Sequence, residues 1–495
     1  MKKEAKTFIG LVGVVALLCA PLLVVDVPPL LDYPNHLARL WLLAVGRSDP
    51  VLAPMFVVQW GVIPNLAIDV VGPPLLRVLP VHVAGRLLLA MVMMLPFFGV
   101  LALHRAIFGR LHPWAVASAL VMASGAFLLG FLNFVVGIGG ALLLAAGWIA
   151  GRARWPVRTV VLASLGSAVL FFCHLMGVLF ALVLIGAWEA RSWRRLLAVL
   201  PVAVLPGLLY LAAPLGAVAD GVEYLPLSGK LLQLLAPFVG YVGWLDWLTT
   251  AAVALFLLAS WWRGRLEAPR GVVVALGGLA VLYAVAPYAF KGTQSLDTRF
   301  VFMVVPLLFA GLRPVMGRWA MLGFGGLVIA RTAVLALAWH GHAADLAQVR
   351  AVLADVAPGE RVFVASVAPN EAPAYWARAP LARRLSNGLR TDVHLPALAL
   401  IERRAFWPLL FDEPSQQPVL WVPAYQALAD RNGGLVDHLA LDRAALCGYD
   451  FLLLLGAGGE PDLAGFAGHA MSLVSATDAA ALFRVRACAV TPPAG

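Results

Sequence analysis

The stretch that decides the fold is FIGLVGVVALLCAPLLVVDVPPLLDYPNHLAR, residues 8–39. It begins with an apolar run, Phe8–Val25, of about the length that a helix needs to cross a bilayer. It ends with Asp32–Arg39, which gathers an acid, an amide, an imidazole and a guanidinium in one short segment. This order predicts a transmembrane helix that leads directly into a polar cluster at the membrane surface.

The composition of the whole chain supports this interpretation. The 495 residues are 62% hydrophobic and only 13% charged, whereas soluble domains are about half apolar. The chain is therefore expected to be a polytopic α-helical membrane protein. Its net charge of +10 then reflects basic membrane loops and not a nucleic-acid partner. The run Phe8–Val25 is long for a signal peptide and is followed by no small-residue cleavage site, so we expect it to be retained.

Similar apolar runs follow and predict about eleven spans. The expected spans are Phe8–Val25, His82–Leu103, Trp114–Phe131, Asn133–Ala150, Val157–Phe172, Leu175–Trp188, Leu196–Leu215, Leu245–Trp262, Gly271–Phe290, Phe300–Leu312 and Trp319–Trp339.

The distribution of Lys and Arg gives the orientation. Basic residues gather in the N-terminus and in every second loop, which are all short, and cytoplasmic loops carry this excess. The N-terminus is therefore expected on the cytoplasmic side of a bacterial inner membrane. Two long loops, 26–81 and 217–244, and the segment 340–495 would then be extracytoplasmic. We expect a membrane domain over 1–339 and a separate domain over 340–495.

The outer segments differ in character. Leu37–Ala44 is typical of an amphipathic helix whose apolar side lies in the membrane interface. The C-terminal segment alternates β-branched runs with helical patterns, which predicts a small α/β domain of about 150 residues. Its expected strands are Arg361–Ala365, Val419–Val422, Phe451–Leu455 and Leu482–Arg486, and its expected helices include Ala343–Val356 and Leu435–Leu446.

The four cysteines fall into two groups. Cys19 and Cys173 lie in or beside membrane spans and are expected to be packing residues. Cys447 and Cys488 both lie in the C-terminal segment, where an oxidising compartment would permit a disulfide. Spacing alone leaves a disulfide and two separate buried thiols open.

Asp32 has two interpretations. As a helix N-cap it would satisfy the first turn, with Pro34 inside that turn and Asn35 and His36 facing solvent. As a catalytic residue it would present a carboxylate at the membrane surface and act as a general base toward a hydroxyl, with His36 and Arg39 binding an anionic phosphate.

Two further clusters are expected at the outer surface. His174 lies between two spans and is either a hydrogen-bonded helix-end histidine or a contact for phosphate or metal. Lys291 and Arg299 bracket a short outer loop that also contains Asp297. They are either interfacial anchors or a clamp for a lipid phosphate.

Other charged residues carry weaker signals. Arg331 lies inside the last span, where an ionisable residue is a functional candidate by default. Asp220 and Glu223 are acids of the second outer loop without a distinguishing pattern. The chain has no zinc-type spacing of Cys and His and no GxSxG elbow, which argues against hydrolases of those classes.

With Asp32-Tyr33-Pro34-Asn35-His36 directly after the first helix, the apolar loop to residue 81 and the segment after Trp339, the chain resembles GT-C fold glycosyltransferases. The resemblance implies a membrane enzyme that moves a sugar from a polyprenyl-phosphate donor to a glycan or lipid-linked acceptor of the cell envelope. It implies Asp32 as general base, and a donor phosphate held by His36, Arg39, His174, Lys291 and Arg299.

The same resemblance leaves several features open. Asn35, Asp297, Arg331 and Glu223 are additional candidates. Many members of the family have a paired Asp-Glu or Asp-x-Asp motif in the first outer loop, whereas here Asp32 is the single acid of the motif, and Asp26 or Asp49 could approach it in space. A divalent metal ion therefore stays open as a cofactor. The rival functions are a transporter or flippase, which would need more intramembrane charge, and a non-enzymatic membrane scaffold.

Overall fold

The structure is a computed structural model that describes residues 2–123, 125–214, 221–290, 293–367, 376, 379–460 and 462–486. The chain divides into two compact units. The first consists of Met1–Val24, Trp60–Val70 and Arg86–Leu337, and the second of Val25–Gln59, Val71–Gly85 and Ala338–Gly495.

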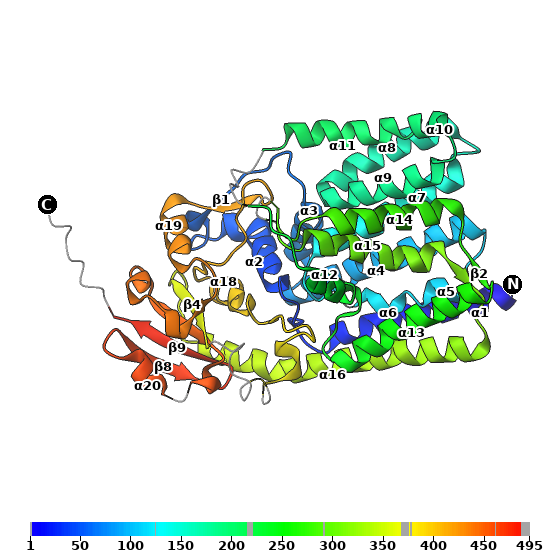
Figure 1. Ribbon diagram of the computed structural model, residues 1–495. Helices are drawn as coiled ribbons and strands as arrows, with labels where there is room; N and C mark the ends of the chain where they lie inside the picture. The colour runs from blue at the N-terminus through cyan, green and yellow to red at the C-terminus, as the bar shows by residue number, and fades with distance from the viewer. Residues whose placement is uncertain are drawn as a thin grey trace. The chain divides into compact units, whose positions relative to one another are not determined.

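The first unit is helical (Figure 1). Its helices are α1 (Lys2–Cys19), most of α4 (Val81–Phe108), α5 (Pro113–Val116), α6 (Ala119–Met122), α7 (Leu132–Gly151), α8 (Pro156–Cys173), α9 (Leu175–Glu189), α10 (Trp193–Leu197), α11 (Leu200–Ala212), α12 (Leu227–Gln233), α13 (Gly243–Trp262), α14 (Arg270–Val285), α15 (Leu296–Gly311) and the first part of α16 (Arg318–Leu353). Two strands of two residues each, β2 (Leu266–Glu267) and β3 (Arg313–Pro314), pair antiparallel and join two of its loops.

The long helices of this unit lie side by side. α7 packs against α8 and α9, α9 packs against α14, and α14 packs against α15 (Figure 1). Gly137 and Gly177 meet where α7 and α9 come closest, since a Cβ on Gly177 would lie 2.8 Å from the Cα of Gly137. Small residues at such a crossing let two apolar helices approach without an intervening side chain. This contact holds the start of α9, and with it His174, against α7.

Helical residues occupy each expected span, but their lengths differ. Among the described residues, six helices are long and apolar enough to cross a membrane, and four apolar helices are shorter. The expected span Phe300–Leu312 lies in α15, most of which is buried by its neighbours and need not contact lipid. The number of helices that cross the membrane therefore stays a prediction.

The expected span Trp114–Phe131 is not one helix. It contains the single-turn helices α5 and α6, followed by turns. The Ser118 hydroxyl donates to the Ala115 carbonyl at 2.7 Å, a local bond that competes with continued helix. Gly125 and Gly130 have positive φ angles of 48° and 80°, a left-handed conformation that ends right-handed helix and that glycine adopts easily.

The second unit combines the first outer loop with the C-terminal segment. Strand β1 (Phe56–Val58) pairs antiparallel with β5 (Val419–Trp421). Helix α2 (Tyr33–Ala44) packs against α18 (Leu398–Arg403). Leu37, Leu40 and Leu42 are at most 1% exposed, so the apolar side of α2 is covered by protein. The expected interfacial helix Leu37–Ala44 is thus a buried helix, because the C-terminal segment supplies its apolar partner.

A five-stranded sheet forms the other part of this unit. Its order is β6 (Val436–Asp437), β4 (Val362–Ser366), β7 (Phe451–Leu455), β9 (Ala480–Val485) and β8 (Met471–Ala476). β6, β4 and β7 are parallel, and β9 pairs antiparallel with β7 and with β8. β4 and β7 are buried along their whole length, which fits their continuous apolar sequence. Helices α19 (Pro423–Asn432) and α20 (Leu463–Ala467) belong to the same unit.

One expected helix of this segment is absent. Residues 435–446 contain β6 and two short 3₁₀ turns instead. The Asp437 and Asp442 side chains accept hydrogen bonds from the backbone N–H groups of Leu439 and Ala444. Such local bonds stabilise turns at the expense of helix. Among the described cysteines, Cys447 is disulfide-bonded and Cys19 and Cys173 are free, while Cys488 lies outside the described residues.

Candidate functional site

Asp32 occupies the N-cap position of α2 but does not act as a cap. Within the described first turn of α2, no backbone N–H donates to its carboxylate, and Pro34 lies in that turn. The carboxylate faces His394 instead, with Oδ1 of Asp32 3.4 Å from Nε2 of His394. The two side chains are 13% and 10% exposed, so the pair is largely enclosed and still reaches the surface of its unit. The carboxylate is therefore available for a role other than capping.

His394 lies at the start of a short 3₁₀ helix, η7 (Leu395–Ala397). Its ring is held edge-on between Trp407 and Phe411, with centroid distances of 5.9 and 5.1 Å. Upstream, the Leu395 N–H donates to the Asp392 carbonyl at 3.0 Å. Asp392 in turn accepts two hydrogen bonds of 2.8 Å from Arg390.

Asn35, on the first turn of α2, connects the two segments. Its amide nitrogen donates to the Leu409 carbonyl at 2.7 Å and lies 3.3 Å from Nδ1 of His394. Its amide oxygen accepts the Phe411 N–H at 3.0 Å. The side chain is fully buried, so Asn35 does not face solvent and binds the C-terminal segment to the helix that follows Asp32.

The remaining polar residues of α2 are also enclosed. His36 is 8% exposed and packs edge-on against Phe411 at 5.7 Å. Arg39 is fully buried within the unit. Only Asp32 of this motif thus combines a charged side chain with partial exposure.

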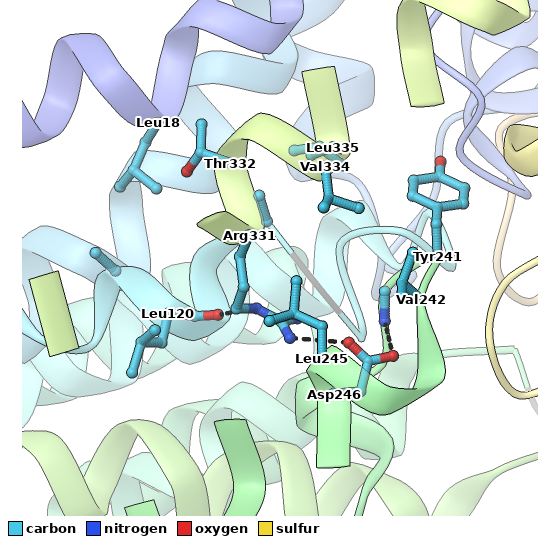
Figure 2. Close-up of a pocket in the computed structure, with 13 residues that line it drawn as sticks. Leu18, Leu120, Tyr241, Val242, Leu245, Asp246, Arg331, Thr332, Val334 and Leu335 are labelled. Atoms are coloured by element: carbon cyan, nitrogen blue, oxygen red, sulfur yellow. Dashed lines mark hydrogen bonds and ion pairs between the residues drawn. The ribbon is translucent and has the colours of Figure 1, made fainter. Parts of the chain in front are cut away.

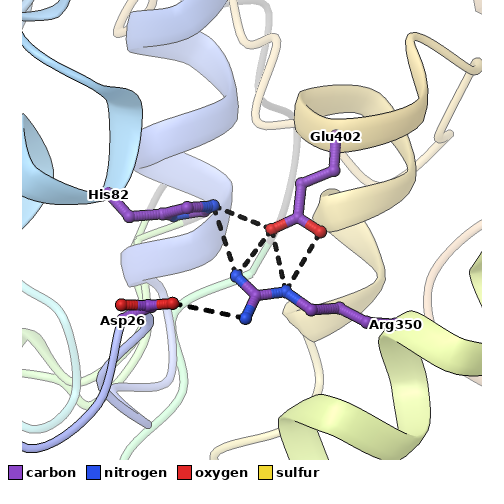
Figure 3. Close-up of polar contacts among 4 residues, drawn as sticks. All are labelled: Asp26, His82, Arg350 and Glu402. Atoms are coloured by element: carbon purple, nitrogen blue, oxygen red, sulfur yellow. Dashed lines mark hydrogen bonds and ion pairs between the residues drawn. The ribbon is translucent and has the colours of Figure 1, made fainter.

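A charged network fixes the segment that leads to Asp32 (Figure 3). Arg350 donates to both carboxylate oxygens of Glu402, at 2.8–3.1 Å, and its third nitrogen lies 3.4 Å from Asp26. His82 lies 2.7 Å from the same Glu402 carboxylate. Burial raises the pKa of Glu402, but the hydrogen bonds from His82 and Arg350 outweigh it and hold that pKa below its usual range. The network joins four separate parts of the second unit.

His174 forms the second candidate centre, in the first unit. It is the N-cap of α9, and its Nδ1 accepts the Met176 N–H at 3.0 Å. Its Nε2 lies 3.1 Å from Nη1 of Arg299, on the first turn of α15. Burial, together with the adjacent guanidinium, holds the pKa of His174 well below its usual range. A neutral ring whose Nδ1 accepts a hydrogen bond carries its proton on Nε2.

The pair His174–Arg299 therefore directs two N–H donors toward each other. Neither the imidazole Nε2–H nor the guanidinium offers an acceptor to the other. Phe134 borders the pair, with its ring 5.2 Å from that of His174 and 5.8 Å from the Arg299 guanidinium carbon.

A small apolar pocket lies near this pair. Phe302, one turn along α15 from Arg299, has its ring centroid 6.1 Å from that of Phe134 and lines the pocket together with Val135, Ile138 and Pro306. The first unit thus has a polar pair of donors close to an apolar pocket.

The neighbours of Arg299 are used structurally. Asp297 is fully buried, accepts the Thr298 N–H at 2.7 Å and lies 3.5 Å from the ammonium of Lys230. Lys230 also donates to the carbonyls of Tyr283 and Ala286 at 3.0 and 2.8 Å, at the end of α14. Asp297 and Lys230 thereby fasten α12 to α14 and α15. Lys291 lies outside the described residues.

Arg331 is saturated by protein acceptors (Figure 2). Its three nitrogens donate to the carbonyls of Leu120 and Phe238 at 3.1 and 2.7 Å and to the Asp246 carboxylate at 2.8 Å. The other Asp246 oxygen accepts the Gly240 N–H at 2.9 Å. Arg331 thus fixes the loop before α13 to α6 and α16, and these contacts indicate a structural role for this functional candidate.

The last candidates add little. Glu223 is exposed, and its backbone pairs with that of Ala289. Asp220 lies outside the described residues. In the described parts of the chain, no group of three or more His, Cys, Asp or Glu residues has a geometry that could hold a metal ion.

Sequence reasoning missed His394. It lies in the segment TDVHLP, more than three hundred residues after Asp32, where no motif or periodicity distinguishes it. The only available signal was the position of a histidine before Leu395-Pro396 in an apolar stretch, which is equally typical of a core histidine. Its role depends on the tertiary fold.

Comparisons with known proteins identify a similar fold among solved structures. No protein-family model matches the chain, and no curated protein matches its sequence. The fold is similar to that of ArnT from Cupriavidus metallidurans, a GT-C fold polyprenyl-phosphate-dependent glycosyltransferase. Its structure bound to undecaprenyl phosphate matches with a TM-score of 0.54 and 13% identity, over 97% of this chain and 98% of that one. The apo structure of ArnT matches with a TM-score of 0.52 and 12% identity, over 98% of both chains.

Proposed function

We propose that this protein is a membrane glycosyltransferase that moves a sugar from a polyprenyl-phosphate donor to a glycan or lipid-linked acceptor, with Asp32 as the general base. The observation that carries the proposal is the state of the Asp32 carboxylate. It stands at a helix start without serving as a cap, lies 3.4 Å from an imidazole nitrogen and retains partial exposure. A carboxylate that served only as a helix cap would not need a contact with the imidazole of His394.

The fold supports the same reaction class. The GT-C architecture extends over almost the whole chain, and the structure it resembles was determined with undecaprenyl phosphate bound. Fold likeness alone does not assign a substrate, so the donor class is inferred here from the fold together with the two candidate centres.

The proposed chemistry needs one base and one anion-binding site. The acceptor hydroxyl loses its proton to Asp32 while its oxygen forms a bond to the anomeric carbon of the sugar. The bond between that carbon and the phosphate oxygen breaks, and the polyprenyl phosphate leaves with the bonding electron pair. The products are the glycosylated acceptor and the lipid phosphate, whose negative charge needs donors to stabilise it.

His174 and Arg299 are proposed to bind that phosphate. Nη1 of Arg299 lies 3.1 Å from Nε2 of His174, and charge-assisted hydrogen bonds to phosphate are among the strongest in proteins. The pocket lined by Phe302 provides an apolar surface near this pair. Lys291 remains a candidate for the same phosphate on sequence grounds alone.

The location of the reaction follows from charge. The basic residues of the chain predict that the loop with Asp32 and the turn with His174 both face the outer side of the inner membrane. The donor's headgroup would lie in that layer. The segment 340–495 is proposed to help bind the acceptor.

A deletion strain complemented with variants tests the proposal. Asp32→Asn keeps the shape of the side chain and removes the base, so the strain should lack one glycan or glycolipid and accumulate its polyprenyl-linked sugar. Asp49→Asn is the matched control, since Asp49 is an acid of the same loop whose carboxylate pairs with Arg404 at 2.7 Å. A wild-type glycan profile with Asp32→Asn would overturn the role of Asp32. Movement of a lipid-linked sugar without a new glycosidic bond would identify a transporter.

A further inference from the structure

We propose that His394 is the positioning residue for Asp32 and that Asn35 fixes the imidazole in the tautomer that this role requires. The inference rests on the proposed function, because it concerns the same carboxylate. It adds a residue from the C-terminal segment to the reaction centre.

The orientation of the Asn35 amide is settled by its backbone partners. A backbone N–H, that of Phe411, faces its oxygen, and a backbone carbonyl, that of Leu409, faces its nitrogen. Exchanging the two atoms would set donor against donor and acceptor against acceptor. The nitrogen is therefore the atom that points at Nδ1 of His394, at 3.3 Å.

This donor determines where the imidazole proton lies. Nδ1 must accept, because a proton there would face the N–H of Asn35. The neutral ring then carries its proton on Nε2, the nitrogen 3.4 Å from Asp32.

The resulting chain of donors runs from Asn35 through His394 to Asp32. A hydrogen bond from Nε2–H would fix the orientation of the carboxylate, so that Oδ2 is left for the acceptor proton. The observed 3.4 Å is longer than the usual range of about 2.7–3.2 Å for an N–H···O hydrogen bond, and this bond is proposed to tighten when the substrates bind, as catalytic hydrogen bonds commonly do. His394 itself is not the base, since the lone pair on its Nδ1 is engaged by Asn35.

The surroundings hold the ring in this position. Trp407 and Phe411 pack edge-on against it, and the Arg390–Asp392 ion pair braces the turn from which it projects. A histidine that only filled the core would not need an amide donor at one nitrogen and a partly exposed carboxylate at the other.

Kinetics of purified full-length variants test the inference. The assay follows transfer of radiolabel from the polyprenyl-linked sugar fraction extracted from the source organism's own membranes. His394→Phe keeps an aromatic ring against Trp407 and removes the donor. His394→Gln retains an N–H near the position of Nε2. We expect His394→Phe to lower kcat by about 100-fold, the lower range for a displaced acid–base group, with KM for the donor unchanged.

The conservative variant separates positioning from packing. His394→Gln should recover most of kcat, and Asn35→Leu, which removes the tautomer control, should behave like His394→Phe. Wild-type kcat in His394→Phe would overturn the inference and leave the proposed function intact. Loss of activity in His394→Gln equal to that of His394→Phe would also overturn it. Full activity in Asp32→Asn would instead contradict the proposed function itself.

Discussion

His394 in the second unit and His174 in the first both accept a hydrogen bond at Nδ1, from Asn35 and from the Met176 backbone respectively. Both rings are therefore directed to carry their proton on Nε2. The difference lies in what that proton meets. For His394 it is the carboxylate of Asp32, and for His174 it is the guanidinium of Arg299.

The comparison distinguishes two kinds of centre. At His394 a donor faces an acceptor, which suits the proposed role of Asp32 as the base. At His174 two donors face each other, which suits the proposed role of this pair in binding phosphate.

Reversing the charge of Arg299 should break the comparison most severely. Arg299→Glu would give His174 a carboxylate partner, as His394 has, and fill the place proposed for phosphate. We expect the affinity for undecaprenyl phosphate in detergent to fall by at least about 100-fold, since two charge-assisted hydrogen bonds are lost and repulsion is added. Quenching of tryptophan fluorescence measures it. Unchanged affinity would contradict the assignment of His174 and Arg299 as phosphate-binding residues.

Arg331 provides a second contrast, because its donors already have acceptors. Arg331→Gln leaves the Asp246 carboxylate buried without its ion pair, and such a loss costs about 3–5 kcal/mol. We expect a marked fall in Tm and retained binding of undecaprenyl phosphate in the protein that remains folded. Arg299→Gln should show the opposite pattern, with weaker binding and a smaller change in Tm. Thermal unfolding of both variants in the same detergent decides between them.

Acid should loosen the second unit first. The folded pKa values of Glu402, Asp392 and Asp450 all lie below their usual range, since arginine partners, and His82 for Glu402, outweigh the effect of burial. Their contribution is therefore present above about pH 4.5 and is lost as pH falls through the lower folded values. Tm measured from pH 7 to pH 3 should fall steeply below about pH 4, and less steeply in Glu402→Gln. A flat profile for wild type would contradict these ion pairs.

The smallest effect is expected at Glu223. Its side chain is exposed, and surface substitutions usually change stability by less than about 0.5 kcal/mol. Glu223→Gln should retain wild-type Tm, binding and transfer. A loss of transfer of more than tenfold would contradict this expectation and make Glu223 a candidate for the reaction centre again.

Much of the fold was predictable because it depends on local patterns. Apolar runs marked where helices lie, and the β-branched run at 361–365 and the short apolar run at 451–455 marked β4 and β7. The sequence could not show that residues 25–59 share a unit with the C-terminal segment, since the apolar side of α2 suits lipid and protein equally. The broken segment at Trp114–Phe131 depends on a serine side chain and two glycines, which a hydropathy pattern does not register.

The candidate centres were predictable only in part. Asp32, His174 and Arg299 were identified because polar residues are rare beside apolar spans. Arg331 gave the same signal, and only its acceptors Leu120, Phe238 and Asp246 reveal a structural role. His394 gave no signal, because its significance arises from a carboxylate more than three hundred residues away.

The central claim is that the Asp32 carboxylate is the base for sugar transfer. A single-turnover assay tests it most directly, with purified wild type and Asp32→Asn in liposomes that contain the labelled polyprenyl-linked sugar fraction and the membrane acceptor fraction. The account predicts that Asp32→Asn binds undecaprenyl phosphate like wild type but transfers label at least about 100-fold more slowly. Raising the pH should not restore the transfer rate of the variant. Transfer by Asp32→Asn at the wild-type rate would contradict it.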